Sequence, residues 1–279
     1  MTQQLRYVTA NGARLAYQIH GEGSGRPSAI FVHGYSGRST GDAYADLLPA
    51  LAQVFTVYAL DLRGHGASAS EFEGWSLAAL ADDVAAVARE LGLVGALYIG
   101  HSIGGFTGLF CEVRHPGTFS AMCLLTTAGA GGAGHADPNV GKLLIEQGRD
   151  PEAMRGNFAP MYVHGGDGAA NVEAILLVDR SVHEAFFADY PTRVISNEIR
   201  DIDIPVLVLN GAKDIVVPLA EQHATALALP HCKEVTYMTE GHMLPRESGK
   251  LAAREIINFW TYDVPETLAR GARTPTSVF

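Results

Sequence analysis

Short apolar runs recur along the chain, and segments with helical spacing separate them. Runs of this kind suit strands that are covered on both faces of a sheet. Near the N-terminus, Asn11-Gly12 lies between two strand-like segments and predicts a hairpin, because both residues tolerate the positive φ of a tight turn. The predicted strands are residues 5–9, 14–19, 29–33, 54–60, 96–100, 121–125, 205–209 and 234–238.

The clearest helix covers residues 77–91, with Ser76 as its N-cap and Gly92 as its stop. A second helix should begin just after Ser102 and end before Pro116, because the residue that precedes a proline disfavours the helical conformation. Strands that alternate with helices predict an α/β fold with a mostly parallel central sheet and helices on both faces. The apolar stripe of the first helix consists of Leu77, Leu80, Val84, Val87 and Leu91.

The alternation breaks between about residues 127 and 203. A glycine-rich stretch opens the break, and helix-like segments follow at about residues 140–148, 151–163 and 171–190. We interpret this region as a helical cap, because it starts and ends in strands of the same sheet. The predicted division is a core of residues 1–127 and 204–264, a helical cap insertion over 128–203, and a loose polar tail over 265–279.

The size of the chain, 279 residues and 29.7 kDa, suits one large α/β domain with a small insertion. A formal net charge of −10 argues against nucleic acid and against anionic membrane surfaces as partners. The three cysteines are sparse and lack CxxC spacing, so they predict neither a disulfide framework nor a zinc site. Neither a signal-peptide pattern nor a membrane-spanning apolar stretch is visible, which makes a cytoplasmic location the default expectation.

The pentapeptide Gly100-His101-Ser102-Ile103-Gly104 is a G-x-S-x-G motif between a predicted strand and a predicted helix. A sharp turn at this place strains the backbone of the serine and leaves no room for side chains two positions away. It also lifts the hydroxyl clear of the sheet and aims the N-terminus of the helix at developing negative charge. Ser102 is therefore the candidate nucleophile.

A serine nucleophile needs a base, and His242 is the candidate among 11 histidines. It follows the last predicted strand, at the sheet edge where reactive groups gather in open α/β sheets. It also completes the chain order Ser, acid, His. Three other histidines near the same edge, His33, His65 and His101, are interpreted as structural or pocket-lining residues.

The acid that orients the base should be Asp214, which follows the strand over residues 205–209. A simple turn residue is the alternative for this aspartate. The oxyanion hole should consist of two backbone N–H groups. One is that of Ile103, directly after the nucleophile, and the other is that of Tyr35, in the loop after the strand over 29–33, with Ser36 as the second choice.

These motifs together resemble the α/β-hydrolase superfamily. The resemblance covers about residues 4–262 apart from the cap, and it implies an α/β-hydrolase fold. It is specific for the fold and the three catalytic positions, and it leaves the substrate open. The segments that carry it are His33-Gly34, residues 61–68 (DLRGHGAS), residues 100–105 (GHSIGG), Asp214 and Gly241-His242.

We expect the cap to cover a substrate pocket. The alternative is that most of its apolar side chains pack the cap onto the core. Phe186, Phe187 and Tyr190 are available for the lining. The predicted pocket residues are His33, Ser36, His101, Met154, Phe158, Met161, Tyr162 and Met243.

The leading functional hypothesis is a serine hydrolase that cleaves a small carboxylic ester or lactone through an acyl-serine. Carbon–carbon bond hydrolysis of a diketone-type substrate, or cofactor-free perhydrolase or dioxygenase chemistry, would suit the same scaffold. A non-catalytic ligand receptor is the hypothesis from a different class. No G-x-G-x-x-G follows the first strand and no H-E-x-x-H occurs, so the sequence indicates neither a nicotinamide cofactor nor a metal. The oligomeric state is left open.

Overall fold

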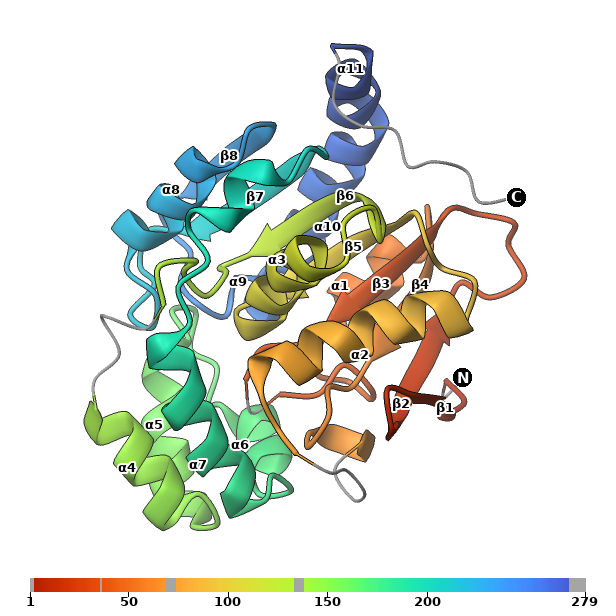
Figure 1. Ribbon diagram of the computed structural model, residues 1–279. Coiled ribbons are helices and arrows are strands. Elements are labelled where there is room, and N and C mark those ends of the chain that lie inside the picture. The colour runs from red at the N-terminus through yellow and green to blue at the C-terminus, as the bar shows by residue number, and fades with distance from the viewer. Residues whose placement is uncertain (1–2, 36, 69–73, 133–137, 271–279) are drawn as a thin grey trace.

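The computed structural model describes residues 3–35, 37–68, 74–132 and 138–270. Within these residues the strands form one eight-stranded sheet (Figure 1). Its order is β1 (Arg6–Ala10), β2 (Ala13–His20), β4 (Thr56–Leu60), β3 (Ser28–Val32), β5 (Ala96–His101), β6 (Phe119–Leu125), β7 (Val206–Gly211) and β8 (Cys232–Tyr237). The pairings β1–β2 and β2–β4 are antiparallel, and every pairing from β4 to β8 is parallel. The mostly parallel sheet predicted from the sequence is therefore confirmed.

The predicted N-terminal hairpin is present. Ala10 pairs with Ala13 across the turn. Asn11 and Gly12 adopt φ values of 48° and 72°, the left-handed conformation that a tight hairpin turn requires at both central positions.

Helices cover both faces of the sheet, as the alternating pattern predicts (Figure 1). Successive residues of β3 point to opposite faces: Ile30 and Val32 pack with α2 and α3, whereas Ala29 and Phe31 pack with α1 and α10. None of the helices in the described part of the chain is long and apolar enough to cross a membrane. The helices of the sheet region are α1 (Leu47–Leu51), α2 (Leu77–Glu90), α3 (Ile103–Arg114), α8 (Leu219–Ala228), α9 (Leu244–Glu247), α10 (Gly249–Asn258) and α11 (Val264–Ala269).

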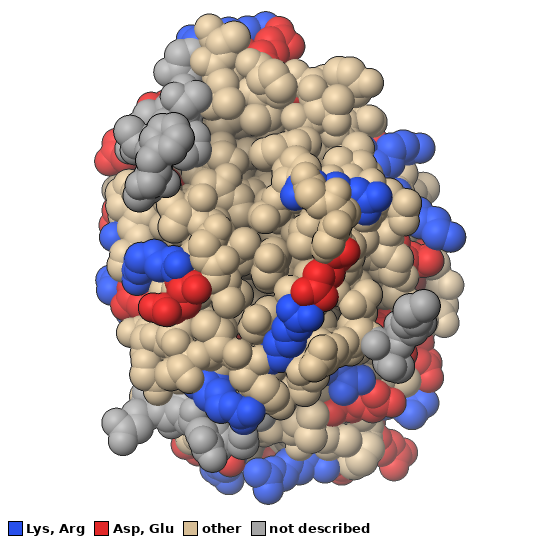
Figure 2. Space-filling view, turned by 90° about the vertical axis from the view of Figure 1, so that its right-hand side faces the viewer, with Lys and Arg blue, Asp and Glu red and all other residues tan. Residues whose placement is uncertain are grey.

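Charged side chains of both signs are mixed on the face drawn in Figure 2. Blue and red residues lie next to one another there, and a broad uncharged area separates the groups. The excess of acidic residues in the chain therefore does not produce a single-sign surface on this face.

Helix α2 begins at Leu77, as predicted, and ends at Glu90, one residue before the predicted end. The Ser76 hydroxyl accepts a hydrogen bond from the backbone N–H of Ala79 at 3.0 Å, and Gly92 adopts a φ of 66° just beyond the helix.

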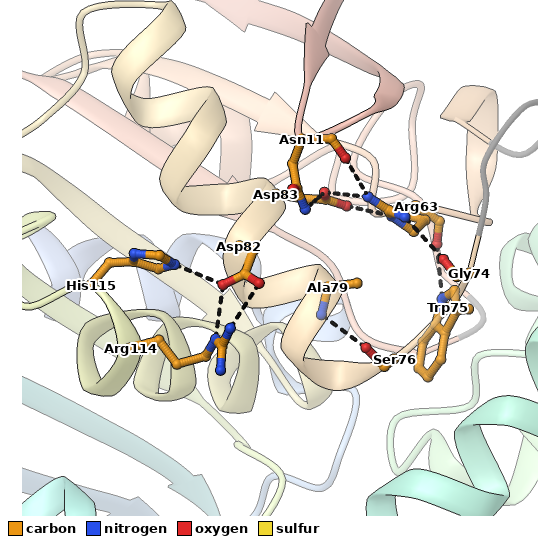
Figure 3. Close-up of polar contacts among 10 residues, drawn as sticks. All are labelled: Asn11, Arg63, Gly74, Trp75, Ser76, Ala79, Asp82, Asp83, Arg114 and His115. Atoms are coloured by element: carbon orange, nitrogen blue, oxygen red, sulfur yellow. Dashed lines mark hydrogen bonds and ion pairs between the residues drawn. The ribbon is translucent and has the colours of Figure 1, made fainter.

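Two neighbouring carboxylates tie α2 to the rest of the core (Figure 3). Asp82 accepts hydrogen bonds from Arg114 at 2.8 and 2.9 Å and from His115 at 2.7 Å, at the end of α3. Asp83 is buried and accepts bonds from the guanidinium of Arg63 at 2.8 and 2.6 Å. Since Arg63 lies in the loop after β4, this buried ion pair fixes that loop against α2.

In the described part of the segment between β6 and β7, four α-helices gather at one end of the molecule (Figure 1). They fall within residues 128–203, the segment predicted as a cap. Their contacts form a small core of their own, separate from the two clusters on the sheet. These helices are α4 (Pro138–Gln147), α5 (Pro151–Phe158), α6 (Ala169–Ile175) and α7 (Arg180–Asp189). The buried members of their core are Leu144, Met154, Phe158, Val172 and Ile175.

Two expectations about local structure are wrong. The single helix predicted over residues 171–190 is divided into α6 and α7, because the carboxylate of Asp179 accepts the backbone N–H of Ser181 at 2.9 Å and caps a new helix. The loose tail predicted from residue 265 is helical in its first residues. Pro265 occupies the first turn of α11, and Val264 is buried in the core cluster on the α1 and α10 face. Residues 271–279 lie outside the described residues.

Candidate active site

Ser102 lies on a strained turn between β5 and α3. Its φ of 53° and ψ of −118° are unfavourable for a residue with a side chain. The flanking glycines are required by space: a Cβ on Gly100 would lie 2.5 Å from the carbonyl carbon of Gly104, and one on Gly104 would lie 2.5 Å from the carbonyl oxygen of Val32. The G-x-S-x-G pattern is therefore the sequence requirement of this turn.

The structure brings the three predicted polar side chains into one hydrogen-bonded row. The Ser102 Oγ lies 3.1 Å from Nε2 of His242, and Nδ1 of the same ring lies 2.8 Å from Oδ2 of Asp214. The three residues follow β5, β8 and β7, so the parallel sheet gathers them at one edge. With Nδ1–H donating to the carboxylate, Nε2 is left as the acceptor for the serine hydroxyl.

The carboxylate of Asp214 is held by further donors. Its Oδ1 accepts the backbone N–H groups of Val216 at 2.8 Å and Val217 at 2.9 Å, and its Oδ2 also accepts the side-chain amide of Gln222 at 3.1 Å. The side chain is completely buried. These bonds stabilise the ionised form away from water and leave the carboxylate one orientation toward His242.

The main chain of His242 is fixed by two donors. Its carbonyl oxygen accepts the hydroxyl of Thr126 at 2.9 Å and Nε2–H of His101 at 3.0 Å. Nδ1 of His101 in turn accepts the hydroxyl of Tyr44 at 2.8 Å. Burial lowers the pKa of His101 well below its ordinary value, so its ring is neutral, as this pattern of one donor and one acceptor requires.

The two residues predicted to form the oxyanion hole, Ile103 and Tyr35, belong to segments close to Ser102. Ile103 is the first residue of α3, so its N–H has no helical carbonyl four residues earlier to bond. Tyr35 lies in the loop after β3, next to Gly34, where an added Cβ would lie 3.2 Å from the Cβ of Ser102. Both residues line the same cavity as the serine. Ser36, the second choice, lies outside the described residues.

The side chain of Tyr35 joins this loop to α7. Its hydroxyl lies 2.5 Å from Nδ1 of His183, and its ring stacks on Phe186 with centroids 4.0 Å apart. Burial lowers the pKa of His183 to about 4, so the imidazole is neutral and accepts the phenol hydrogen. The position of a candidate oxyanion donor therefore depends on a contact with the cap segment.

A cavity of about 330 Å³ opens beside Ser102 and His242. Its walls come from the loops at the sheet edge and from α4, α5, α6 and α7, and most of the lining is apolar. The apolar lining includes Val140, Leu144, Phe158, Met161, Phe186, Phe187, Ile215, Val217 and Met243.

Four of the predicted pocket residues line this cavity: His101, Phe158, Met161 and Met243. Three others do not, and each has another role. His33 is fully buried and bonds the Gly34 carbonyl and the Leu62 N–H with its two ring nitrogens.

Met154 is fully buried in the core of the cap helices. The hydroxyl of Tyr162 donates to Oδ1 of Asn171 at 2.6 Å and so supports a residue of the lining.

Sequence reasoning missed three polar residues of the lining, Asn157, Asn171 and Arg246. For Arg246 a signal was available: it is an arginine four residues after His242, and this spacing places two residues on one side of a helical turn. No comparable local signal marks the two asparagines.

Two other acidic residues near the site have structural partners. Asp61 is buried and accepts the backbone N–H groups of Ser39, Thr40 and Ala67 at 2.6–2.9 Å. Glu240 bonds His164 and Ser248 rather than the ring of the neighbouring histidine.

A serine on a strained strand-to-helix turn, with a histidine and a buried carboxylate in line with it on a mostly parallel sheet, is the arrangement of the α/β-hydrolases. The family model described as the alpha/beta hydrolase family matches residues 29–255, and the chain belongs to this family.

Among the relatives, the bifunctional esterase/perhydrolase DCH of Acinetobacter calcoaceticus is 28% identical over 91% of this chain and 98% of its own length. The crystal structure of the enol-lactonase from Burkholderia xenovorans has a TM-score of 0.80 at 22% identity and covers 92% of this chain and 100% of its own. A meta-cleavage product hydrolase from Pseudomonas fluorescens, CumD, has a TM-score of 0.76 at 20% identity over 92% of this chain and 98% of its own. At these identities the two structures show the shared fold.

Proposed function

We propose that the protein is a serine hydrolase that cleaves small carboxylic esters or lactones through an acyl-serine intermediate. The observation that carries the proposal is the row of hydrogen bonds from Ser102 through His242 to Asp214 at the wall of the cavity. The esterase activity in the name of the Acinetobacter relative supports the choice of ester chemistry.

Acylation begins when Oγ of Ser102 attacks the carbonyl carbon while Nε2 of His242 accepts the hydroxyl proton. Asp214 stays ionised and stabilises the imidazolium. When the tetrahedral intermediate collapses, the carbon–oxygen bond to the leaving alcohol breaks and His242 donates the proton to that oxygen. Water then repeats these steps on the acyl-serine, with His242 as base, and releases the carboxylic acid.

The developing oxyanion is placed between the N–H groups of Ile103 and Tyr35 in this mechanism. Removing one such donor in other hydrolases costs about 3 kcal/mol of transition-state stabilisation. The N-terminus of α3, which begins at Ile103, adds a favourable dipole at the same place.

The test is a panel of 4-nitrophenyl esters and lactones of increasing chain length, assayed with the wild type and with Ser102→Ala. We expect wild-type hydrolysis of at least one short member and a loss of about 10⁵-fold or more in kcat for the variant. Ser24→Ala is the matched control, because Ser24 is an exposed serine outside the cavity. If Ser102→Ala retains the activity of this control, the proposed mechanism is wrong.

Perhydrolysis is a second candidate, favoured by the name of the same Acinetobacter relative. Hydrogen peroxide would replace water in attacking the acyl-serine, so that a peracid is released and Ser102 is regenerated with the same residues. Peracid formation from acetate and hydrogen peroxide, measured by oxidation of a halide, tests it. The expected result is peracid formation by the wild type that Ser102→Ala abolishes.

Carbon–carbon bond cleavage is the third reaction to be separated, because CumD shares the fold. A vinylogous diketo acid that loses its visible absorbance on cleavage serves as the probe. Turnover of this probe with no turnover of any ester would replace the ester proposal.

A further inference from the structure

Arg246 brings a positive charge to the wall of the cavity. It lies in α9, four residues after His242, and its guanidinium carbon is 4.8 Å from the ring centre of Tyr44. The charge acts on the buried histidines around the site: besides burial, it is one of the causes that lower the pKa of His33 and of His101. Any ligand next to Ser102 therefore lies in the field of a cation.

The guanidinium has only neutral partners. Its Nη1 donates to Oδ1 of Asn171 at 2.9 Å and lies 3.5 Å from the hydroxyl of Tyr162. Within the described residues, no carboxylate forms an ion pair with Arg246. Arg246 is only partly exposed, and a charge that loses part of its hydration without a counterion is costly to the fold.

The side chain of Arg246 keeps one donor without a partner. Its Nε is buried and makes no hydrogen bond within the described residues, and its remaining polar neighbour is the hydroxyl of Tyr44. Because Nε has almost no accessible surface, a ligand in the cavity would meet the positive charge of the guanidinium rather than this N–H group. A second lining residue, Asn157, also has a buried side-chain N–H group without a partner among the described residues.

Resting on the proposed ester hydrolysis, we infer that Arg246 anchors a carboxylate of the substrate. The natural substrate is then an ester or lactone that carries a free carboxylate besides the bond that is cleaved. The apolar walls take up the chain between these two groups, and Arg246 selects by charge. Arg246 is a specificity residue in this assignment, since the bond-breaking steps use Ser102, His242 and Asp214.

A purely structural role for Arg246 makes a different prediction. The bond from Nη1 to Asn171 ties α9 to α6, and a residue that served only this tie would affect acidic and neutral substrates alike. The ratio of kcat/KM for an acidic substrate to that for its neutral counterpart separates the two roles. A loosened cap would lower both values alike and leave this ratio unchanged.

The experiment uses two pairs of substrates, with the carboxylate on either side of the scissile bond. Mono(4-nitrophenyl) adipate is compared with its methyl-capped diester, and 4-(butanoyloxy)benzoate is compared with its methyl ester. For each pair, the ratio of kcat/KM for the acid to that for the capped form is measured in the wild type, Arg246→Gln, Arg246→Lys and Arg254→Gln. The last variant is the matched control, because Arg254 is an exposed arginine of α10 outside the cavity.

We expect the wild type to prefer the acid in at least one pair. Arg246→Gln should lower that ratio by about 10- to 100-fold, the loss typical of hydrogen bonds to a charged group. Arg246→Lys keeps the charge and controls for a folding defect, so it should retain part of the preference. Arg254→Gln should retain all of it. An unchanged ratio in Arg246→Gln for both pairs, or a wild-type preference for the capped forms, overturns the inference.

Binding of adipate to Ser102→Ala by calorimetry separates this inference from the proposed function. If adipate binds and the added Arg246→Gln change removes the binding, Arg246 is a carboxylate site even when no ester is cleaved. If esters are cleaved and neither adipate binding nor the acid preference depends on Arg246, the ester proposal survives and the carboxylate anchor is excluded.

Discussion

The sheet core and the helices α4–α7 build opposite walls of one cavity by different means. In the core, backbone geometry places the reactive groups: Ser102 lies on a strained turn, and the carboxylate of Asp214 accepts two backbone N–H groups. In the helices between β6 and β7, packed apolar side chains such as Phe158 and Phe187 form the wall. Under the proposed function, the chemistry depends on main-chain positions and the choice of substrate on side-chain volume and charge.

The largest effect should come from the core acid. Asp214→Asn keeps the volume and removes the charge that orients and stabilises the histidine, so we expect kcat to fall by about 10⁴-fold. Steady-state kinetics on the preferred 4-nitrophenyl ester measure this loss. Asp203→Asn is the matched control, because Asp203 bonds His231 and is not part of the row formed by Ser102, His242 and Asp214. Equal activities of the two variants would contradict the role of Asp214.

A pair of glycines tests the contrast between the two regions directly. Gly104→Ala in the core would force a Cβ to 2.5 Å from a backbone oxygen and displace the turn that holds Ser102, so we expect a loss of about 100-fold in kcat. Gly156→Ala in α5 meets open space and should stabilise the protein by up to about 1 kcal/mol, since alanine favours a helix. Activity assays and urea unfolding of both variants check this. A harmless Gly104→Ala would show that the turn tolerates more than its geometry indicates.

The core could be predicted further from the sequence than the cap. Apolar periodicity and Asn11-Gly12 locate the strands and the hairpin, and G-x-S-x-G requires its turn for steric reasons that are local in the chain. The pocket depends on which side chains of distant helices face the cavity. Periodicity alone does not distinguish Phe158, which lines it, from Met154, which packs among the cap helices.

The division of residues 171–190 shows the same limit at the level of secondary structure. An apolar helical pattern continues through this segment, but a single side chain at Asp179 caps a new helix within it. The N-cap hydrogen bond of Asp179 joins residues that are close in the sequence. The direction that the chain takes after it depends on packing with α4 and α5. The polar lining residues Asn171 and Arg246 likewise become neighbours only in the folded chain.

A substitution in the cap wall should change the preference for acyl-chain length by a smaller factor than the core substitutions change kcat. Phe187→Ala removes a ring that lines the cavity and should shift the ratio of kcat/KM toward longer acyl chains by about 10-fold, because each methylene in an apolar pocket changes specificity by a modest factor. The ester panel measures this ratio. Leu177→Ala, an exposed position of the same segment, is the control. An unchanged profile would assign the selection of chain length to the core.

The pH dependence of stability compares buried histidines of the two regions. Burial lowers the pKa of His33 to about 4 and of His65 to about 3 in the core, and that of His183 to about 4 in the cap. Between pH 6.5 and 4, the unfolded chain takes up protons on these groups while the folded protein does not. Stability should therefore fall as the pH falls through this window, by up to about 1.4 kcal/mol per pH unit for each group.

Urea unfolding at several pH values measures this slope. His183→Asn should remove the contribution of the cap and leave that of the core, whereas the exposed His223→Gln should leave the slope as it is. A slope that does not change in His183→Asn would show that this histidine is protonated in the folded protein.

The central claim, that the row of side chains at the sheet edge activates one serine, is tested most directly by intact-protein mass spectrometry after reaction with a fluorophosphonate. The account predicts a single covalent adduct on the wild type, mapped to Ser102 by peptide sequencing, and a rate of labelling that collapses in His242→Ala. A wild-type protein that stays unlabelled, or one that is labelled at another residue, would contradict it.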